Sequence, residues 1–536
     1  MEILKKFFIT LILCLIVPGS LYALERELFL TPEGRQVEVE KNAIIVKYKK
    51  NMSSAVKRSI EASAGVRYAG GMKKLGIERV QLQDGTTLEE ALEKFLGMDN
   101  VIYAEPVYLR KASKLPLEYS DINALKNRQW ALEKVNAPEA WELATGGETV
   151  VAVLDTGIDL DHPELVSNMW VNPSPDTVCD TYFDSWGYTY SIKYDTNGWN
   201  FVGDNNDPDD DNVSSGGHGT HCAGIIAARA NTSTYTIVGM SWFNKLMAVK
   251  TLNNIGWGTD WDIIYGIVYA ADRGADVISM SFGGTDSSQA EEDAVNYAYE
   301  KGCVLVAASG NDGSRSVDFP AAYNNVIAVG ASSSSDTVSD FSNYGTAMDL
   351  VAPGETIYST YIGGYGNLTG TSMACPLVAG LASLVISYWE GHNNAVWTPQ
   401  QVRNIMTSNC DDINSTAYLG WDKYAGYGRM NAERTLQFLT AGAVKIDEEK
   451  VLVYPNPFNP GTQRSLLVLP RDYGGTIKKL RIYSIDGQEV REVGGSGSVV
   501  YWDGKNNDGE MCSSGLYFYF LDTTVGSRKG KITLIR

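Results

Sequence analysis

Near-continuous apolar runs alternate with helix-spaced segments through the middle of the chain. The runs are rich in Val, Ile, Leu and Ala, and they cover residues 149–155, 245–252, 275–283, 302–310 and 325–332. A strand that is apolar at every position is buried on both faces, as in a parallel sheet covered by helices. Segments 262–274 and 289–302 between these runs carry helical spacing. The pattern predicts an α/β domain with a parallel sheet sandwiched by helices.

A shorter pattern precedes this stretch. Apolar runs predict strands over 43–49, 76–83 and 101–109, and helical spacing predicts helices over 57–64 and 88–96. The alternation is of the β-α-β-β-α-β type, which is typical of a compact α+β unit. The polar stretch 111–121 that follows predicts a linker and a processing region.

The two ends of the sequence have patterns of their own. Residues 1–23 begin with Lys5 and Lys6, continue as a short apolar run and end at Ala23, which indicates a secretory signal peptide. The run is too short to span a membrane, and we expect no span once it is removed. From residue 450, turn-rich and alternating segments with a hairpin signal at 486–487 predict a small β-sandwich.

Composition and net charge narrow the classes of molecule that the protein is expected to bind. The chain has 536 residues, of which 44% are hydrophobic and 20% charged, as expected for several globular domains. Its formal net charge of −19 disfavours nucleic acid and anionic membranes and suits an exported soluble protein. Seven cysteines without a CxxC pair predict neither a disulfide scaffold nor a zinc site. Cys222, Cys303 and Cys375 are expected to be small buried residues.

Three Gly-rich segments carry candidate chemistry: Asp155 in VVAVLDTGID, His218 in GGHGTHCAGI and Ser372 in GTSMACPLVAG. A serine hydroxyl needs a histidine to take its proton, and the histidine needs a carboxylate to orient it. Each residue alone has a structural alternative. In these alternatives, Asp155 caps the next element, His218 and His221 are a pair of metal ligands, and Ser372 caps a helix. Their joint occurrence indicates nucleophilic acyl transfer.

These segments, in the order Asp…His…Ser, resemble the subtilase family over about residues 119–440. The resemblance implies Asp155 as orienting acid, His218 as general base and Ser372 as nucleophile, with His221 as a structural second histidine. Asn311 in AASGND would donate its amide to the tetrahedral oxyanion together with the Ser372 backbone N–H.

The resemblance also implies two backbone rails that hold a peptide substrate as an added strand. They are Ser281, Phe282 and Gly283 on one side and Gly256, Trp257 and Gly258 on the other. Trp257 is expected to narrow an outer subsite. Cys375 and Leu377 depart from the family pattern, where a small polar residue and a histidine are usual, and we expect altered packing there.

The flanks have resemblances as well. Val101 to Pro106 match the V-x-Y-x-E-P sequence of inhibitor-type propeptides, which implies that the chain's own propeptide is an intramolecular inhibitor. YPNPFNP, YWDGKNNDG and SSGLYFYFL resemble Ig-like domains of flagellar hook-capping proteins and sorting tails of secreted bacterial enzymes. Such a tail implies a secretion machinery or the cell surface as partner. The expected division is 1–23 signal peptide, 24–118 propeptide, 119–440 catalytic domain and 449–536 β-sandwich.

An acidic stretch, DNNDPDDDN at 204–212, is the candidate calcium site, because crowded oxygen ligands suit a hard cation. The candidate ligands are Asp204, Asp207 and Asp209, by analogy with thermostable subtilases, and Glu164, which matches another calcium position of the family, with Asn231 in the matching loop. A solvated acidic loop is the open alternative. No organic cofactor is expected.

The sequence is thus identified as a secreted or cell-surface serine endopeptidase of the subtilisin type, made as a self-processing zymogen and acting on proteins or peptides. A catalytically dead subtilase fold used for surface binding is the competing class. A serine-carboxyl peptidase is disfavoured, because the chain lacks the Glu/Asp pair that would replace His218.

Overall fold

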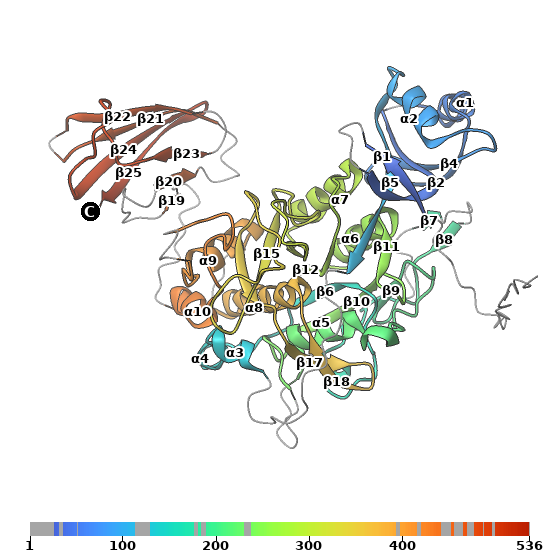
Figure 1. Cartoon of the computed structure of the whole chain (residues 1–536), viewed down its shortest axis with the longest axis horizontal. Helices are drawn as coiled ribbons and strands as arrows, with labels where there is room; N and C mark the ends of the chain where they lie inside the picture. Colours follow the sequence, from blue (N-terminus) through green and yellow to red (C-terminus); the bar gives the residue numbers. More distant parts are fainter. Residues whose placement is uncertain are drawn as a thin grey trace, which may run out of the picture.

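The computed structural model describes most of the chain outside its ends and some connecting segments. The described residues are 26–31, 36–50, 52–112, 129–175, 181–183, 189–229, 237–392, 397–414, 420–440, 452–454, 465–468, 476–485, 487–495 and 499–534. The predicted signal peptide, most of the predicted linker and the predicted boundary at 118 lie outside them. Figure 1 shows three folded parts along the chain.

A seven-stranded parallel sheet forms the centre of the molecule, in the order β16-β15-β14-β12-β6-β10-β9. Its strands are β6 (Val150–Asp155), β9 (Gly198–Asn200), β10 (Lys245–Lys250), β12 (Val277–Met280), β14 (Val304–Ala308), β15 (Val326–Ser332) and β16 (Leu350–Pro353). The predicted α/β fold with a parallel sheet is confirmed. The edge strands β9 and β16 were not predicted, because three or four residues carry too little periodicity.

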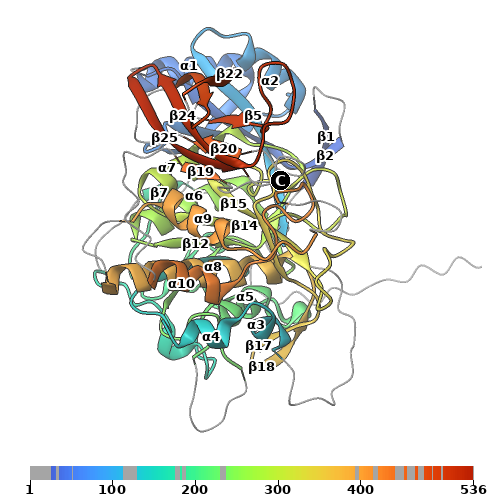
Figure 2. The same cartoon turned by 90° about the vertical axis from the view of Figure 1, so that its left-hand side faces the viewer.

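Helices cover both faces of this sheet, as Figure 2 shows, with α6 and α7 above the strands and α5 and α8 below. Alternate residues of β6 enter two separate cores: Val151 and Val153 pack on the α5 and α8 side, Ala152 and Leu154 on the α6 and α7 side. The helices are α5 (His218–Ala227), α6 (Asp260–Asp272), α7 (Gln289–Glu300) and α8 (Thr371–His392), with α3 (Trp130–Lys134), α4 (Ala137–Trp141), α9 (Pro399–Ser408) and α10 (Ala432–Thr440) on the α8 side. The pattern of burial on both faces explains the all-apolar strands.

Helix α8 is the only described helix long and apolar enough to cross a membrane. Of its apolar window, 89% is buried inside the protein, where it packs against the sheet. It is therefore a core helix of the central domain.

The N-terminal unit, residues 26–112, has its own core and an antiparallel sheet in the order β5-β2-β4-β3, with β1 added to β2. Its elements are β1 (Arg26–Leu30), β2 (Gln36–Tyr48), α1 (Ser54–Ala64), β3 (Val66–Met72), β4 (Ile77–Leu82), α2 (Leu88–Leu96) and β5 (Val101–Ala112). From β2 onward this is the predicted β-α-β-β-α-β order. Local signals set the helices: Thr87 and Glu90 form a capping box that starts α2, and Gly65 ends α1 with φ +80°.

The C-terminal part is a sandwich of two antiparallel sheets, β19-β20-β23 and β22-β21-β24-β25. Their strands are β19 (Leu452–Tyr454), β20 (Ser465–Val468), β21 (Ile477–Tyr483), β22 (Glu489–Gly494), β23 (Val499–Trp502), β24 (Gly515–Thr523) and β25 (Gly526–Leu534). Trp502 and Leu467 of one sheet share a core with Leu480 and Leu521 of the other. The hairpin signal lies in the turn between β21 and β22, where Gly487 has φ +84°.

The remaining short elements lie in loops of the central domain. They are the 3-10 turns Val166–Asn168 and Val213–Ser215, and the strands β7 (Thr181–Phe183), β8 (Thr189–Ser191), β11 (Trp257–Thr259), β13 (Phe282–Gly283), β17 (Ile357–Tyr361) and β18 (Gly364–Leu368).

Candidate active site

Three element ends bring the predicted acid, base and nucleophile to one region. Asp155 is the last residue of β6, His218 the first of α5, and Ser372 the second of α8. His218 Nδ1 lies 2.7 Å from Asp155 Oδ1, and both side chains are fully buried. Asp155 Oδ1 also accepts the Thr156 backbone N–H at 2.7 Å. The carboxylate therefore orients the ring, with Nδ1 as donor and Nε2 available for a proton.

Ser372 is held by Ser281 on the neighbouring loop. Ser372 Oγ donates to the Ser281 carbonyl at 2.8 Å, and Ser281 Oγ donates to the Ser372 carbonyl at 3.0 Å. His218 Nε2 is buried and has no hydrogen-bond partner among the described residues. In this state the serine hydroxyl is therefore turned toward Ser281, and it must rotate before His218 can take its proton. Such looser geometry is common before a substrate is bound.

Asn311 follows β14 and lies next to the nucleophile through Thr371. Its Oδ1 accepts the Thr371 backbone N–H and the Thr371 Oγ1–H, each at 2.9 Å. These two bonds fix the amide, and its Nδ2 is buried without a partner among the described residues. A fixed donor of this kind can stabilise an oxyanion formed beside Ser372. Sequence reasoning missed Thr371 and Ser281 in these positioning contacts.

His221 serves a different partner from His218. Its Nε2 lies 3.0 Å from the Ile357 carbonyl at the start of β17, and burial lowers its pKa to about 3. The ring is therefore neutral and joins α5 to β17. Among the described residues, the one group of three close ligand-type side chains is Asp155, His218 and Cys222, whose ligand atoms lie within 4.8 Å of one another. Cys222 is one turn along α5 and donates its Sγ–H toward the Ser372 carbonyl at 3.5 Å.

The two predicted rails flank the end of strand β5 from the N-terminal unit. Trp257, Gly258 and Thr259 of β11 pair with Lys111, Arg110 and Leu109, in antiparallel register. Phe282 and Gly283 of β13 pair with Ala112 and Lys111 on the other side. The Ala112 N–H also donates to the Gly256 carbonyl at 2.9 Å. We call the space between β11 and β13 the slot; β5 fills it with a backbone-paired strand, and Figure 1 shows this strand running into the central domain.

The N-terminal unit is also fixed to helix α7. The Glu105 carboxylate accepts from Ser288 Oγ at 3.0 Å and from the Gln289 and Ala290 backbone N–H groups at 2.9 Å. This is a carboxylate on a helix N-terminus, where the unpaired N–H groups favour negative charge. Lys47 and Tyr103 contact Asp293 further along α7.

The predicted calcium ligands do not gather. Asp207 and Asp209 are exposed, and Asp209 Oδ1 accepts the Leu160 N–H at 3.1 Å. Glu164 is buried elsewhere, with Oε2 3.4 Å from His162 Nδ1. Within the described part of the chain, no three of the four predicted side chains, which include Asp204, form a group of close ligand atoms. They are therefore not a ready-made cage for a hard cation. Asn231 lies outside the described residues.

Two other aspartates of the acidic stretch are engaged with the protein. Asp210 is buried and accepts the Thr220 N–H at 3.0 Å and the Thr220 Oγ1–H at 2.7 Å, in the first turn of α5. Asp211 Oδ1 lies 2.7 Å from the ammonium of Lys250, at the end of β10. The stretch thus helps to position the helix that begins at His218, a role that its composition did not indicate.

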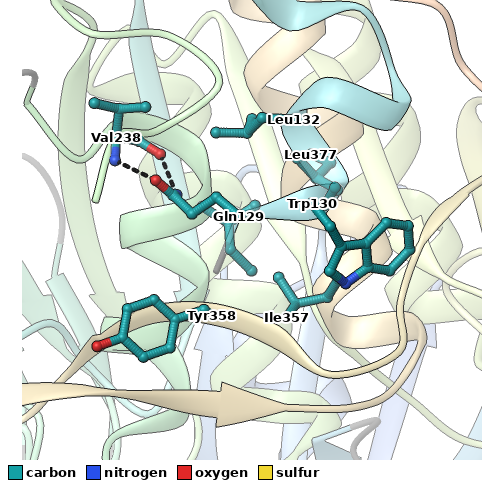
Figure 3. Close-up of a pocket in the computed structure, with 9 residues that line it drawn as sticks. Gln129, Trp130, Leu132, Val238, Ile357, Tyr358 and Leu377 are labelled. Atoms are coloured by element: carbon teal, nitrogen blue, oxygen red, sulfur yellow. Dashed lines mark hydrogen bonds between the residues drawn. The ribbon is translucent and has the colours of Figure 1, made fainter. Parts of the chain in front are cut away.

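The two departures from the family pattern are both packing positions. Cys375 is buried, and its Sγ lies 3.5 Å from the Val306 carbonyl. Leu377 lines a small pocket together with Trp130, Ile357 and other apolar residues, and Figure 3 shows the Gln129 side chain bonded both ways to the Val238 backbone at its edge. The pocket contains none of the candidate catalytic residues. Cys222, Cys303 and Cys375 are buried, as predicted, and each is a free thiol.

A buried Asp–His pair, a serine at a helix start and a fixed amide donor on a parallel α/β sheet define a serine hydrolase. The family comparison agrees: the subtilase family model matches residues 146–428, and the model of the fervidolysin N-terminal prodomain matches residues 31–106. The chain therefore belongs to the subtilase family and is a subtilisin-like serine protease with a prodomain. The C-terminal sandwich lies outside both matches.

Individual relatives agree with this assignment. Thermitase from Thermoactinomyces vulgaris is 39% identical over 313 residues, which is 58% of this chain and 97% of the relative. Thermophilic serine proteinase from Bacillus sp. (strain AK1) is 38% identical over 352 residues, 65% of this chain and 76% of the relative. Subtilisin E from Bacillus subtilis (strain 168) is 34% identical over 393 residues, 72% of this chain and 87% of the relative.

Proposed function

We propose that this protein is a secreted serine endopeptidase that forms an acyl-enzyme on Ser372 and is made as a self-processing zymogen. The single observation that carries the proposal is the prodomain strand β5, which lies in the slot as a backbone-paired peptide and ends at Ala112, opposite Phe282, the residue after Ser281. A peptide held in this way is bound as a substrate would be, and backbone pairing does not depend on its side chains.

The geometry supports a complete acyl-transfer sequence. Ser372 Oγ rotates away from the Ser281 carbonyl, attacks the substrate carbonyl carbon and gives its proton to His218 Nε2. Asp155 Oδ1 accepts from His218 Nδ1–H and stabilises the imidazolium. The oxyanion then receives Asn311 Nδ2–H and the Ser372 N–H, and loss of one such donor costs roughly 10²–10³ in turnover. His218 passes its proton to the leaving amine, and a water repeats the sequence on the ester.

The same contacts support a zymogen. While β5 fills the slot and Glu105 holds α7, no other peptide can pair with β11 and β13. Cleavage of the chain beyond Ala112 would free the catalytic domain to bind substrates. A secreted or cell-surface location is supported by the predicted signal peptide and by the C-terminal sandwich. The test is to fractionate cells that produce either the full chain or a variant that lacks residues 1–23.

A fluorophosphonate probe tests the chemistry. The processed protein obtained from the full chain is expected to take one covalent label and to hydrolyse casein. Ser372→Ala should lose both, His218→Ala should lose most of both, and Ser335→Ala, an exposed serine, should behave as wild type. If the wild-type protein takes no label and cleaves no casein, the dead-fold binding module is the better description.

Calcium binding stays a prediction from the acidic stretch and the family resemblance. If it holds, a chelator lowers the melting temperature, and the shift is lost in an Asp204→Asn/Asp207→Asn variant; a ligand at 100 times its dissociation constant adds about 2.7 kcal/mol. Melting that is the same in chelator and in calcium would contradict it.

A further inference from the structure

One prodomain side chain is buried far more deeply than its charge leads one to expect. Arg110 of β5 is 1% exposed. Its Nη2 lies 2.7 Å from Glu291 Oε2 and its Nε lies 3.2 Å from Glu291 Oε1, so the guanidinium binds this carboxylate through two nitrogens. Arg110 Nε also lies 3.2 Å from Asp260 Oδ1. Both acids belong to the catalytic domain and both are fully buried.

These acids are part of a built pocket, which we call the guanidinium pocket and define by Asp260, Gly284, Glu291 and Tyr323. Asp260 begins α6, and Glu291 lies in the first turn of α7. The Tyr323 hydroxyl lies 3.1 Å from Glu291 Oε2 and 2.8 Å from the Ser288 carbonyl, so it packs against the carboxylate at the start of α7. A Cβ at Gly284 would lie 3.0 Å from Arg110 Nη1 and 3.3 Å from Arg110 Cδ, so the glycine leaves the space that the long side chain needs.

The two acids of the pocket favour a cation. Two carboxylates are buried beside each other there, and Arg110 is the cation that they contact. Removing one partner of a buried ion pair is strongly unfavourable, because the other charge is left without water. A neutral side chain would leave both acids unpaired. A lysine has the same single positive charge as arginine but could not bind Glu291 through two nitrogens, as the planar guanidinium does.

The register places the pocket relative to the reaction. Gly258 is opposite Arg110, Gly283 is opposite Lys111, and Phe282 is opposite Ala112. In an extended chain the next residue would be opposite Ser281, whose carbonyl holds the Ser372 hydroxyl. A peptide bound in this register would be cut after that residue. The side chain in the guanidinium pocket is then the fourth residue before the scissile bond.

We propose that the guanidinium pocket remains a specificity site after the prodomain has left, and that the mature enzyme selects substrates with arginine as the fourth residue before the scissile bond. This rests on the proposed endopeptidase function. The slot binds any extended backbone, so the selection comes from Asp260 and Glu291. The prodomain's Arg110 occupies the pocket as the first substrate of that kind.

The test compares fluorogenic peptides that differ only at this fourth residue: arginine, lysine, and citrulline, which has the shape of arginine without its charge. Hydrogen bonds to charged groups contribute about 1.5–3 kcal/mol each, so kcat/KM for the arginine peptide should exceed that for citrulline by about 10-fold to 100-fold. Lysine should fall between them. In Asp260→Asn/Glu291→Gln, prepared with Arg110→Gln so that no buried arginine is left unpaired, the ratio should fall to about 1.

The matched control is Glu292→Gln, which removes a neighbouring charge on α7 that contacts Gln289 and not Arg110. It should keep the wild-type ratio. Should the wild-type enzyme cleave the citrulline and arginine peptides equally well, or should the neutral-pocket variant keep the preference, the proposal is wrong and Arg110 serves only to dock the prodomain. Fluorophosphonate labelling of the same samples separates this result from a failure of the endopeptidase function, which would leave every peptide uncut and the protein unlabelled.

Discussion

The acidic stretch at 204–212 and the guanidinium pocket are two ways in which this chain places negative charge. The stretch has five aspartates close together in the sequence, and Asp207 and Asp209 among them are exposed. The pocket has two acids far apart in the sequence, Asp260 and Glu291, and both are fully buried against an arginine. The density of charge along a sequence is therefore not by itself the sign of a site, whereas acids that are buried against a cation are.

The largest expected difference between the two regions is in stability. Glu291→Gln, made in the full chain with Ser372→Ala to prevent self-cleavage, leaves Arg110 without its two-nitrogen partner. Breaking a buried ion pair costs about 3–5 kcal/mol, whereas Asp209→Asn at an exposed position should change stability by about 0.5 kcal/mol or less. Thermal unfolding measures both.

Adding Arg110→Gln to Glu291→Gln should recover part of the loss, because a charge without a partner is no longer buried. Equal melting temperatures for Glu291→Gln and Asp209→Asn would contradict the expected difference in stability between the guanidinium pocket and the acidic stretch.

A smaller effect is expected at Asp210, the buried member of the acidic stretch. Asp210→Asn replaces one acceptor oxygen by an NH₂ group beside Thr220, and an unsatisfied buried group costs about 1–3 kcal/mol. Because Thr220 is in the first turn of α5, the rate of fluorophosphonate labelling should also fall. Asp207→Asn is the matched exposed control and should do neither. A harmless Asp210→Asn would show that the stretch behaves as one solvated loop.

The smallest effect is a pH dependence of selectivity. Burial raises the pKa of Asp260 well above its ordinary value, with Glu291 and Glu105 adding to the shift and Arg110 opposing it. Without a cation in the pocket, this acid therefore keeps its proton to higher pH than an exposed aspartate, and it attracts arginine only once the proton is lost. The arginine-to-citrulline ratio should rise with pH, and any pH dependence of catalysis that both peptides share cancels in the ratio. A ratio that is flat between pH 5 and 9 contradicts this, and Asp209→Asn should not change it.

Much of this architecture could be predicted from the sequence, because its signals are local. The buried strands are continuous apolar runs, and Asp155, His218 and Ser372 each lie in a short Gly-rich segment. The guanidinium pocket could not be predicted, for a physical reason. Thr259 is the N-cap of α6 and Ser288 is the N-cap of α7, so Asp260 and Glu291 each lie in the first turn of a helix. Acids are common in a first turn because they stabilise the helix, and their presence there does not indicate a site. Only the packing of α6 beside α7 makes them a pair.

The orientation of the Ser372 hydroxyl was beyond sequence reasoning as well. It depends on a competition between the Ser281 carbonyl and His218 Nε2 for one hydroxyl proton, and the backbone that places these acceptors comes from distant parts of the chain. The candidate calcium ligands are the opposite case. Composition drew attention to Asp204, Asp207 and Asp209, yet composition does not determine where side chains converge.

The slot has a further consequence for the protein once it is processed. While β5 is in place, it is an interior strand of a sheet that spans two domains, and its departure turns β11 and β13 into two facing edge strands. Edge strands with unpaired N–H and C=O groups bind any extended chain that reaches them, including an unfolding copy of the same protein. The mature protease therefore has a sheet with one strand missing. In a concentrated preparation, the chains that fill this position first are segments of other copies of the same protease.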